Sequence, residues 1–149
     1  MDRREMLGVV GAGAAGLVAM GGTARADDQG PHAEHLKTLD ECANTCGRAA
    51  HHCLDQLRKG GQNAEAHALA HELAMDCQAT CSLATDLTAR GSRVAHHVHG
   101  ACAEVCAQCA KACEQAGDDE IMKECARICR EAEKVCRQMS QQGQRGGAR

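Results

Sequence analysis

The sequence contains no phenylalanine, tyrosine or tryptophan, and it has a single proline. Without aromatic rings the chain offers little apolar area per residue, so an aliphatic core alone would stabilise a fold weakly. Alternating runs of β-branched residues are also missing, which argues against β-strands. These absences favour a helical fold that has some additional source of stability.

The motifs of common enzymes are missing as well. The chain has no His-Glu-x-x-His motif, no glycine-rich phosphate loop followed by lysine, and no serine in a nucleophile elbow. The formal net charge of −3 is mildly acidic and the two signs are interspersed, so nothing indicates a nucleic acid or an anionic membrane as partner. We therefore predict a protein that is not an enzyme.

The first 26 residues differ from the rest and match an export signal. Arg3 and Arg4 form a twin-arginine pair, residues 8–22 are rich in glycine and alanine, and Ala24-Arg25-Ala26 is a small-x-small cleavage site. The apolar run is too short and too glycine-rich for a membrane anchor, which needs about 20 strongly apolar residues. We predict a twin-arginine signal peptide over residues 1–26 and a mature protein, without a membrane anchor, that is periplasmic or otherwise extracytoplasmic.

Turn-forming residues divide the remaining chain into four helical segments. Helices are predicted over about 31–59, 63–90, 92–116 and 118–141. Glycines lie in the breaks, and residues that can cap the next helix follow them: Asn63, Ser92 and the run Asp118-Asp119-Glu120. Because the connections are short, neighbouring helices must run antiparallel. Residues 27–141 are therefore predicted to form an all-α, antiparallel up-down-up-down four-helix bundle, followed by a disordered tail over 142–149.

Cysteine is the most informative residue type, with twelve among 149 residues. Within each predicted helix the cysteines are three, four or seven residues apart, so they share one face of that helix. That face occupies the interior positions of the bundle, where leucine is usual. The predicted metal ligands are Cys42, Cys46, Cys53, Cys77, Cys81, Cys102, Cys106, Cys109, Cys113, Cys125, Cys129 and Cys136.

Two common chemistries of cysteine could use these sulfurs. Disulfides are the default for a cysteine-rich chain outside the cytosol, but Cβ atoms within one helix face lie about 5–6 Å apart, against about 3.5–4.5 Å in a disulfide. Bridges between helices stay open, so a disulfide-stapled helical interaction module is one alternative. Zinc would need discrete sets of four ligands, whereas the stripes predict a continuous array. A zinc or thiol redox protein is the other alternative.

Cu(I) suits a continuous array of sulfur best. This ion favours thiolate and thioether ligands and tolerates two-coordinate geometry, which neighbouring sulfurs can provide without a loop. If each thiolate bridges two ions and each ion takes two thiolates, the chain binds roughly a dozen Cu(I) ions. Monovalent ions would also neutralise the buried thiolates, so the empty core should hold thiols that release protons as metal enters.

The spacing of the cysteines resembles that of a known family. The Cys-x-x-x-Cys pairs are Cys42 and Cys46, Cys77 and Cys81, Cys102 and Cys106, Cys109 and Cys113, and Cys125 and Cys129. In an exported helical bundle without aromatic residues, these pairs resemble the four-helix-bundle copper storage proteins. The resemblance implies a homotetramer that stores many Cu(I) ions inside each bundle and, in the exported branch of the family, provides copper enzymes with metal.

Two histidines and a methionine are further candidates for metal binding. His35 and His99 lie seven and three residues before the first cysteine of their helices, and antiparallel packing brings them to the end that holds Met139. Imidazole and thioether groups bind Cu(I), so these three side chains could form the port through which copper enters. Alternatively, they cap the polar end of the core and touch no metal.

Overall fold

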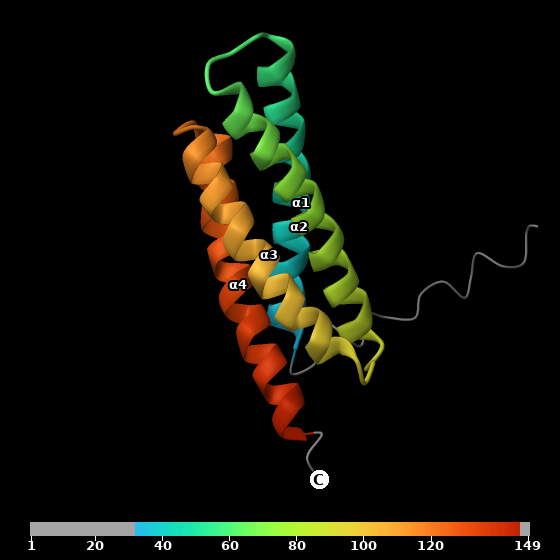
Figure 1. The fold of residues 1–149 in the computed structure, drawn as a ribbon. Coiled ribbons are helices and arrows are strands. Elements are labelled where there is room, and N and C mark those ends of the chain that lie inside the picture. Colours follow the sequence, from blue (N-terminus) through green and yellow to red (C-terminus); the bar gives the residue numbers. More distant parts are fainter. Residues whose placement is uncertain (1–31, 147–149) are drawn as a thin grey trace, which may run out of the picture. The chain divides into compact units, whose positions relative to one another are not determined.

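The computed structural model describes residues 32–146, and the predicted signal peptide lies outside this range. The described residues contain four helices and no strand: α1 (Ala33–Arg58), α2 (Ala64–Ala89), α3 (Ala95–Ala116) and α4 (Glu120–Gly146). Successive helices run in opposite directions (Figure 1). The predicted antiparallel four-helix bundle is confirmed. Between residues 32 and 146, none of the helices combines the length and the apolar character needed to cross a membrane.

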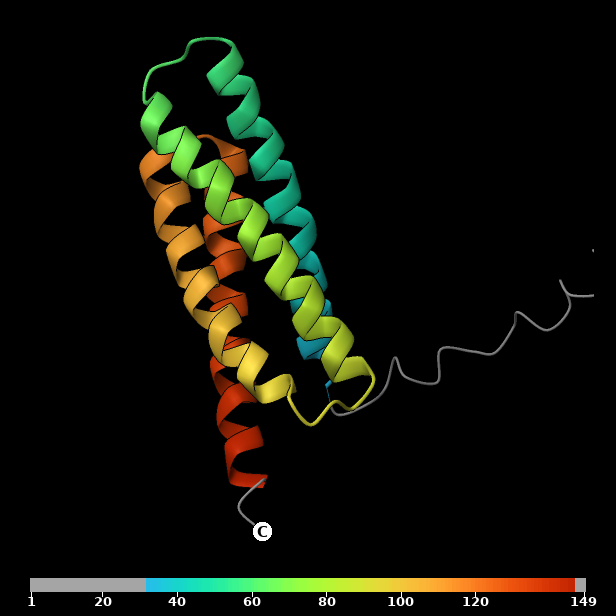
Figure 2. The ribbon, with the colours of Figure 1, turned by 45° about the vertical axis from the view of Figure 1, so that its right-hand side comes forward.

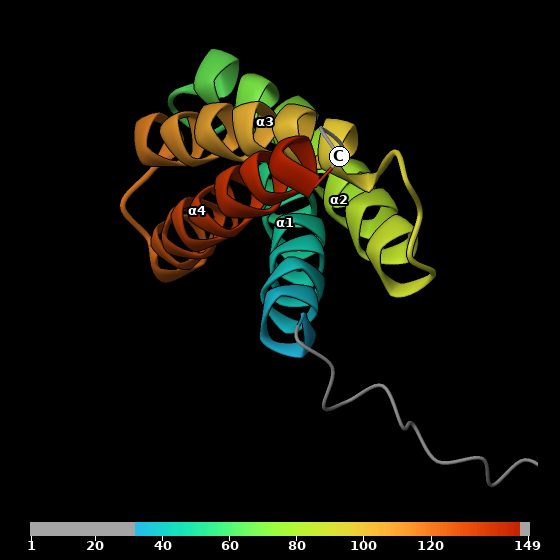
Figure 3. The same cartoon turned by 90° about the horizontal axis from the view of Figure 1, so that it is seen from below.

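The four helices pack in cyclic order. Each helix contacts the next one along the chain, and α4 returns to contact α1, as two further views show (Figure 2, Figure 3). Loops 59–63 and 117–119 lie at what we call the apical end. The start of α1, loop 90–94 and the end of α4 lie at the opposite, basal end. The bundle interior therefore runs as a column between two distinct ends.

Glycine ends α1 and α2 in the same way. Gly60 and Gly91 both have a φ of 65°, a left-handed conformation that costs glycine little. The N–H groups of the residues that follow them then donate back to helix carbonyls, Gly61 to Gln56 at 3.1 Å and Ser92 to Leu87 at 2.9 Å. These two predicted helix ends are confirmed.

The starts of the helices agree less uniformly with the sequence prediction. Asp119 caps α4 as predicted, because its Oδ1 accepts hydrogen bonds from the N–H groups of Ile121 at 3.1 Å and Met122 at 3.2 Å. Asn63 precedes α2, but its side chain makes no capping bond. Ser92 does not cap α3, which begins at Ala95 with Val94 as its N-cap; the N–H of Ser92 instead closes the end of α2.

The end of α4 differs from the predicted boundary at Gln141. The helix continues to Gly146, so residues 142–146 are helical, and residues 147–149 lie outside the described part of the chain. Gln142 and Arg145 have good helix propensity. Gly143 also lies so close to His96 of α3 that an added Cβ would collide with the imidazole. This tertiary contact supports a helical turn at residues 142–146, where the prediction of a disordered tail is wrong.

Small side chains fill most of the core. Cysteine and alanine dominate the buried positions; the largest fully buried side chains are Leu39, Met122, Ile128 and His99. Two glycines mark close helix approach: a Cβ on Gly47 would lie 3.0 Å from Gln78 of α2, and one on Gly100 would lie 3.3 Å from Ser140 of α4. Because the helices approach closely, the short cysteine side chains of facing helices meet at the centre.

Candidate metal-binding core

All twelve cysteines lie within the described residues, and the structure buries every one of them. Each has an exposed fraction of 0 %, and each carries a free thiol. The sequence prediction that the cysteine faces turn toward a shared interior is therefore confirmed. Whether these residues bind metal stays a prediction.

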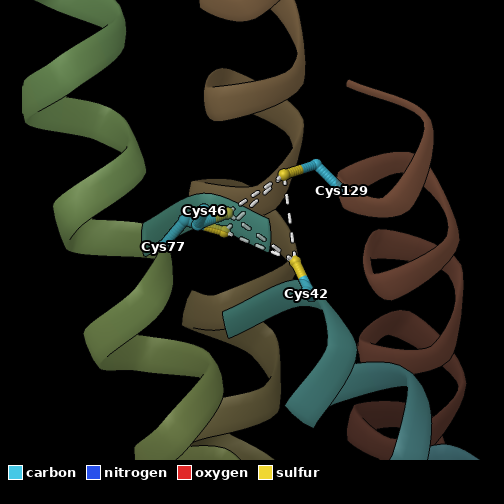
Figure 4. Close-up of side chains that lie close together, drawn as sticks. All are labelled: Cys42, Cys46, Cys77 and Cys129. Carbon is cyan, nitrogen blue, oxygen red and sulfur yellow. Dashed lines mark hydrogen bonds between the residues drawn. The ribbon is translucent and has the colours of Figure 1, made fainter. Parts of the chain in front are cut away.

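The sulfur atoms form a network and are not arranged as isolated pairs. The Sγ atom of Cys129 lies 3.5 Å from that of Cys46, 3.8 Å from that of Cys42 and 3.9 Å from that of Cys77 (Figure 4). These separations are S–H···S contacts, far longer than the roughly 2.05 Å of a disulfide bond. A sulfur with several sulfur neighbours is suited to bridging metal ions, whereas a disulfide framework needs one partner for each cysteine.

The contacts order the sulfurs along the bundle axis. Cys81 and Cys102 are 3.5 Å apart near the basal end, and the network continues through Cys77 and Cys106, which are also 3.5 Å apart. Beyond them, Cys46 lies 3.9 Å from Cys125 and 4.0 Å from Cys109. From the basal to the apical end, the layers are Cys81, Cys102 and Cys136; Cys42, Cys77, Cys106 and Cys129; Cys46, Cys109 and Cys125; and Cys53 and Cys113.

Hydrogen bonds between thiols separate their pKa values. Hydrogen bonds from neighbouring thiols, chiefly Cys106, lower the pKa of Cys42. Cys46 has the opposite shift, because its hydrogen bonds with neighbouring thiols, chiefly Cys109, raise its pKa. The cysteines with a lowered pKa lie one on each helix: Cys42, Cys77, Cys102 and Cys125. Those with a raised pKa include Cys46, Cys81, Cys106, Cys113, Cys129 and Cys136. Within the network, thiols that lose a proton more readily therefore lie next to thiols that hold it more firmly.

The apical end of the core contains a further sulfur. Met122 is fully buried, and the thiol of Cys53 donates to its Sδ atom at 3.8 Å. Burial, with repulsion from Cys125 and Asp119, raises the pKa of the Cys53 thiol to about 11. Met122 lies three residues before Cys125, so the helical period places its thioether on the cysteine face of α4.

His99 occupies the basal end of the core. It is 1 % exposed, its Nε2 lies 2.7 Å from Oγ1 of Thr88, and its Nδ1 has no hydrogen-bond partner. Burial lowers the pKa of His99, and the nearby His35 and His32 lower it further. The imidazole is therefore held neutral, the form in which it binds a metal ion.

A cavity of about 780 Å³ opens beside His99. Met139, which is also buried, lines this cavity together with His99. The third predicted candidate, His35, is half-buried and does not line this cavity. Two histidines that were not predicted, His32 and His96, do line the cavity. The sequence reasoning missed His32, although it precedes His35 by three residues on one helix face and stacks on it at 6.0 Å between ring centroids.

The apical end carries a different polar cluster. Nε2 of His52 lies 3.2 Å from Oδ2 of Asp119, and the ring of His52 meets the buried His67 edge-on at 6.1 Å. Since Asp119 also caps α4, this contact joins α1 to the α3–α4 loop beside Cys53. The two ends of the sulfur column therefore differ in shape and chemistry.

Comparisons with known proteins agree with this fold and core. A family model for copper storage proteins matches residues 28–141. The structure of apo copper storage protein 3 from Bacillus subtilis is similar with a TM-score of 0.63 and 21% identity over 73% of this chain and 98% of that chain. A Cu(I)-bound copper storage protein, BsCsp3, gives a TM-score of 0.65 and 20% identity over 73% and 97%. No curated protein sequence matches this chain.

A third similar structure comes from Nitrosospira multiformis. The protein Nmul_A1745 shares 34% identity and a TM-score of 0.61, over 72% of this chain and 93% of that chain. The alignment with this chain covers 93% or more of each of the three structures, so the similarity extends over the whole of each fold.

Proposed function

Because this chain belongs to the copper storage protein family, we propose that it binds and stores roughly a dozen Cu(I) ions through its core thiolates. The stored copper would be sequestered or supplied to copper enzymes. The observation that carries this proposal is the network of buried free thiols, with Sγ atoms of facing helices 3.5 to 4.0 Å apart. Neighbouring sulfurs at this spacing need only small movements to hold an ion between them.

Charge balance supports a monovalent ion. Among the described buried residues the polar side chains are Thr45, His67 and His99, and none carries a permanent charge. Twelve thiolates without counterions would be prohibitively repulsive in such an interior. One Cu(I) for each thiolate keeps the core neutral, so ion number and cysteine number should match approximately.

We place the port for copper at the basal end. His99 and Met139 line the open cavity there and lie next to the first cysteine layer, and His35 is close enough to His99 to affect its pKa. Neutral imidazole and thioether groups bind Cu(I) reversibly, so they can pass ions to the thiolates without trapping them.

The proposal includes export through the twin-arginine pathway. Its support is the Arg3-Arg4 pair and the Ala24-Arg25-Ala26 cleavage site, both in the sequence before the described residues. The mature protein would then act in the periplasm or another extracytoplasmic space.

We further propose that the protein forms homo-oligomers, and specifically tetramers, through the outer face of α2. Leu69, Met75 and Leu83 on this helix are 46%, 48% and 47% exposed. Exposed large apolar side chains on one helix would be removed from water in contact with another copy of the chain. Family membership makes a further copy of this chain the natural partner.

An anaerobic Cu(I) titration of the reduced protein against a competing chromophoric chelator tests the storage function. Saturation at about a dozen ions per chain is expected, and saturation at one or two would contradict storage. The double variant Cys106→Ser and Cys129→Ser removes two sulfurs from the middle of the column. An unchanged capacity in this variant would show that the central array does not hold the copper.

A further inference from the structure

Four sulfurs in the middle of the core approach one another from several directions. The Sγ atoms of Cys42, Cys46, Cys77 and Cys129 all lie within 4.8 Å of each other and point toward a common centre (Figure 4). Cys42 lies 4.0 Å from Cys46 and 3.8 Å from both Cys77 and Cys129. Cys129 lies 3.5 Å from Cys46 and 3.9 Å from Cys77.

These five separations are close to the edges of a metal–sulfur tetrahedron, and the sixth pair, Cys46 and Cys77, lies within 4.8 Å. With metal–sulfur bonds of about 2.3 Å, the ligand atoms of a regular ZnS₄ centre lie about 3.8 Å apart. The sulfurs come from α1, α2 and α4, so the helices themselves provide the arrangement and no zinc-binding loop is needed. The sequence argument against zinc expected a continuous array of sulfurs without sets of four ligands, whereas the structure contains overlapping sets of four within that array.

We propose that the copper-free core binds one divalent thiophilic cation of the zinc class as a tetrathiolate of Cys42, Cys46, Cys77 and Cys129. This binding goes beyond Cu(I) storage, because its ion, coordination number and stoichiometry all differ. Binding forms four metal–sulfur bonds, releases four thiol protons to solvent and involves no change of oxidation state. The centre carries a charge of −2, which the surrounding core must accommodate.

Neighbouring thiols provide that accommodation. Cys106 lies 3.5 Å from Cys77, and Cys109 lies 4.0 Å from Cys46. As long as these two remain protonated, their S–H groups can donate to the metal-bound thiolates. Hydrogen bonds from such outer partners stabilise the charge of a metal–thiolate centre.

Charge also limits the number of divalent ions to one. Two other groups of four sulfurs lie close enough together to hold a metal ion. One consists of Cys42, Cys77, Cys81 and Cys106, and the other of Cys46, Cys109, Cys125 and Cys129. These two groups share no residue, so geometry alone would allow two ions. Two adjacent centres of charge −2 in an interior without buried cations would repel each other strongly, and the thiol donors would be consumed as ligands.

Anaerobic titration of the reduced full chain with Co²⁺, followed by Zn²⁺, tests the proposal. Co²⁺ in a tetrahedral sulfur site gives intense visible absorption and thiolate-to-metal charge-transfer bands. We expect these bands to saturate at one Co²⁺ per chain and to disappear when one equivalent of Zn²⁺ is added. Saturation at two ions, or the weak spectrum of a hydrated octahedral ion, would overturn the proposal.

Two variants on α4 form a matched pair. Cys129→Ser removes a ligand, whereas Cys136→Ser removes an equally buried thiol outside all three groups. We expect Cys129→Ser to weaken Zn²⁺ binding by more than about 100-fold, beyond the 10–100-fold cost of losing an outer partner. Cys136→Ser should retain the wild-type affinity, and an equal loss in both variants would contradict the assignment. Cys42→Ser provides a second ligand variant if Cys129→Ser does not fold by circular dichroism.

Cu(I) capacity measured on the same samples separates this proposal from storage. A capacity of about a dozen Cu(I) without Co²⁺ binding would overturn the divalent site and leave storage intact. One bound Co²⁺ with a capacity of only one or two Cu(I) would support the divalent site and contradict storage. When both hold, Cu(I) added to the zinc-loaded protein should release one Zn²⁺ per chain, because thiolates prefer the softer ion.

Discussion

His99 shows how strongly one position in the core depends on protonation. Its imidazole is 1 % exposed, its Nε2 is satisfied by Thr88, and its Nδ1 faces no partner. A proton on Nδ1 would place an uncompensated charge at the edge of the sulfur column, so burial lowers the pKa of His99. The neutral form that favours metal binding is thus also the form that favours folding.

We expect the metal-free protein to lose stability in acid because of His99. The unfolded chain binds a proton near the ordinary pKa of 6.5, whereas the folded chain binds it only at lower pH. The neutral imidazole therefore makes its full contribution to the free energy of unfolding above pH 6.5. That contribution declines as the pH falls toward the pKa of His99 in the folded protein. Urea unfolding at about pH 7 and about pH 5 measures how much the free energy of unfolding falls between the two pH values. This fall should be smaller for His99→Gln than for the wild type. Equal losses would refute this role.

Single residues differ in how well the sequence predicts them. The burial of all twelve cysteines follows from their spacing, since a helical period assigns each to one face. For His32 and Met122, spacing indicates the helix face but not the contacts with other helices. The sequence cannot show that His32 lines a cavity with α3 and α4 or that Met122 meets Cys53 of α1, because both depend on how the helices are positioned against each other.

At the scale of elements, the α3–α4 junction depends on one side chain with two contacts. Oδ1 of Asp119 caps α4, and Oδ2 approaches His52 of α1. Because Asp119 is 43% exposed, the ion pair should contribute little, and the cap should dominate. The junction therefore fixes the direction in which α4 leaves its loop.

We expect Asp119→Ala to lower the free energy of unfolding by about 1–2 kcal/mol, the usual cost of losing a side-chain cap. Asp118→Ala is the matched control, because Asp118 is an exposed neighbour that does not cap the helix. Its effect should stay within about 0.5 kcal/mol. Urea denaturation of the metal-free variants measures both values, and a similar change in the two would show that the cap is unimportant.

The boundaries of the elements were predictable where the local chain decides them. Gly60, Gly91 and Asp119 act through contacts with residues close in sequence, so their roles could be predicted. The start of α3 was predicted too early, because Ser92 belongs to the turn that closes α2 and the helix begins only at Ala95. The end of α4 could not be predicted in this way, because Gly143 packs against His96, which is distant in the sequence.

At the scale of the whole molecule, Cu(I) binding should release protons from the core thiols. Most core thiols have a raised pKa, and that of Cys53 reaches about 11, so the empty core is largely protonated at neutral pH. Each Cu(I) that replaces a thiol proton leaves the charge of the interior unchanged. The bundle can therefore fill without building up charge.

We expect about one proton to be released for each Cu(I) bound near neutral pH, and apparent affinity to rise about tenfold per pH unit for each proton displaced. Titration calorimetry in buffers of different ionisation enthalpy measures the proton count. A count near zero would mean that thiolates already exist in the empty core.

The surface of α2 allows a test of assembly. The double variant Leu69→Glu and Leu83→Glu places charge on the exposed apolar face, so it should shift the oligomer to monomers in analytical ultracentrifugation. Val94→Glu is the control, because Val94 is 53% exposed but lies outside α2. Monomers already in the wild type, or no shift in the double variant, would contradict the proposed interface.

The difference between the two ends of the bundle has a consequence for the order of turnover. An open cavity meets the sulfur column at His99, whereas Cys53 and Met122 lie beside the His52–Asp119 contact at the far end. If ions pass only through the basal end, the Cu(I) ions that bind last, nearest that end, are the first to leave. Recently acquired copper would then be available to a recipient at once, and the oldest ions would form a reserve that is drawn upon only when the outer layers are empty.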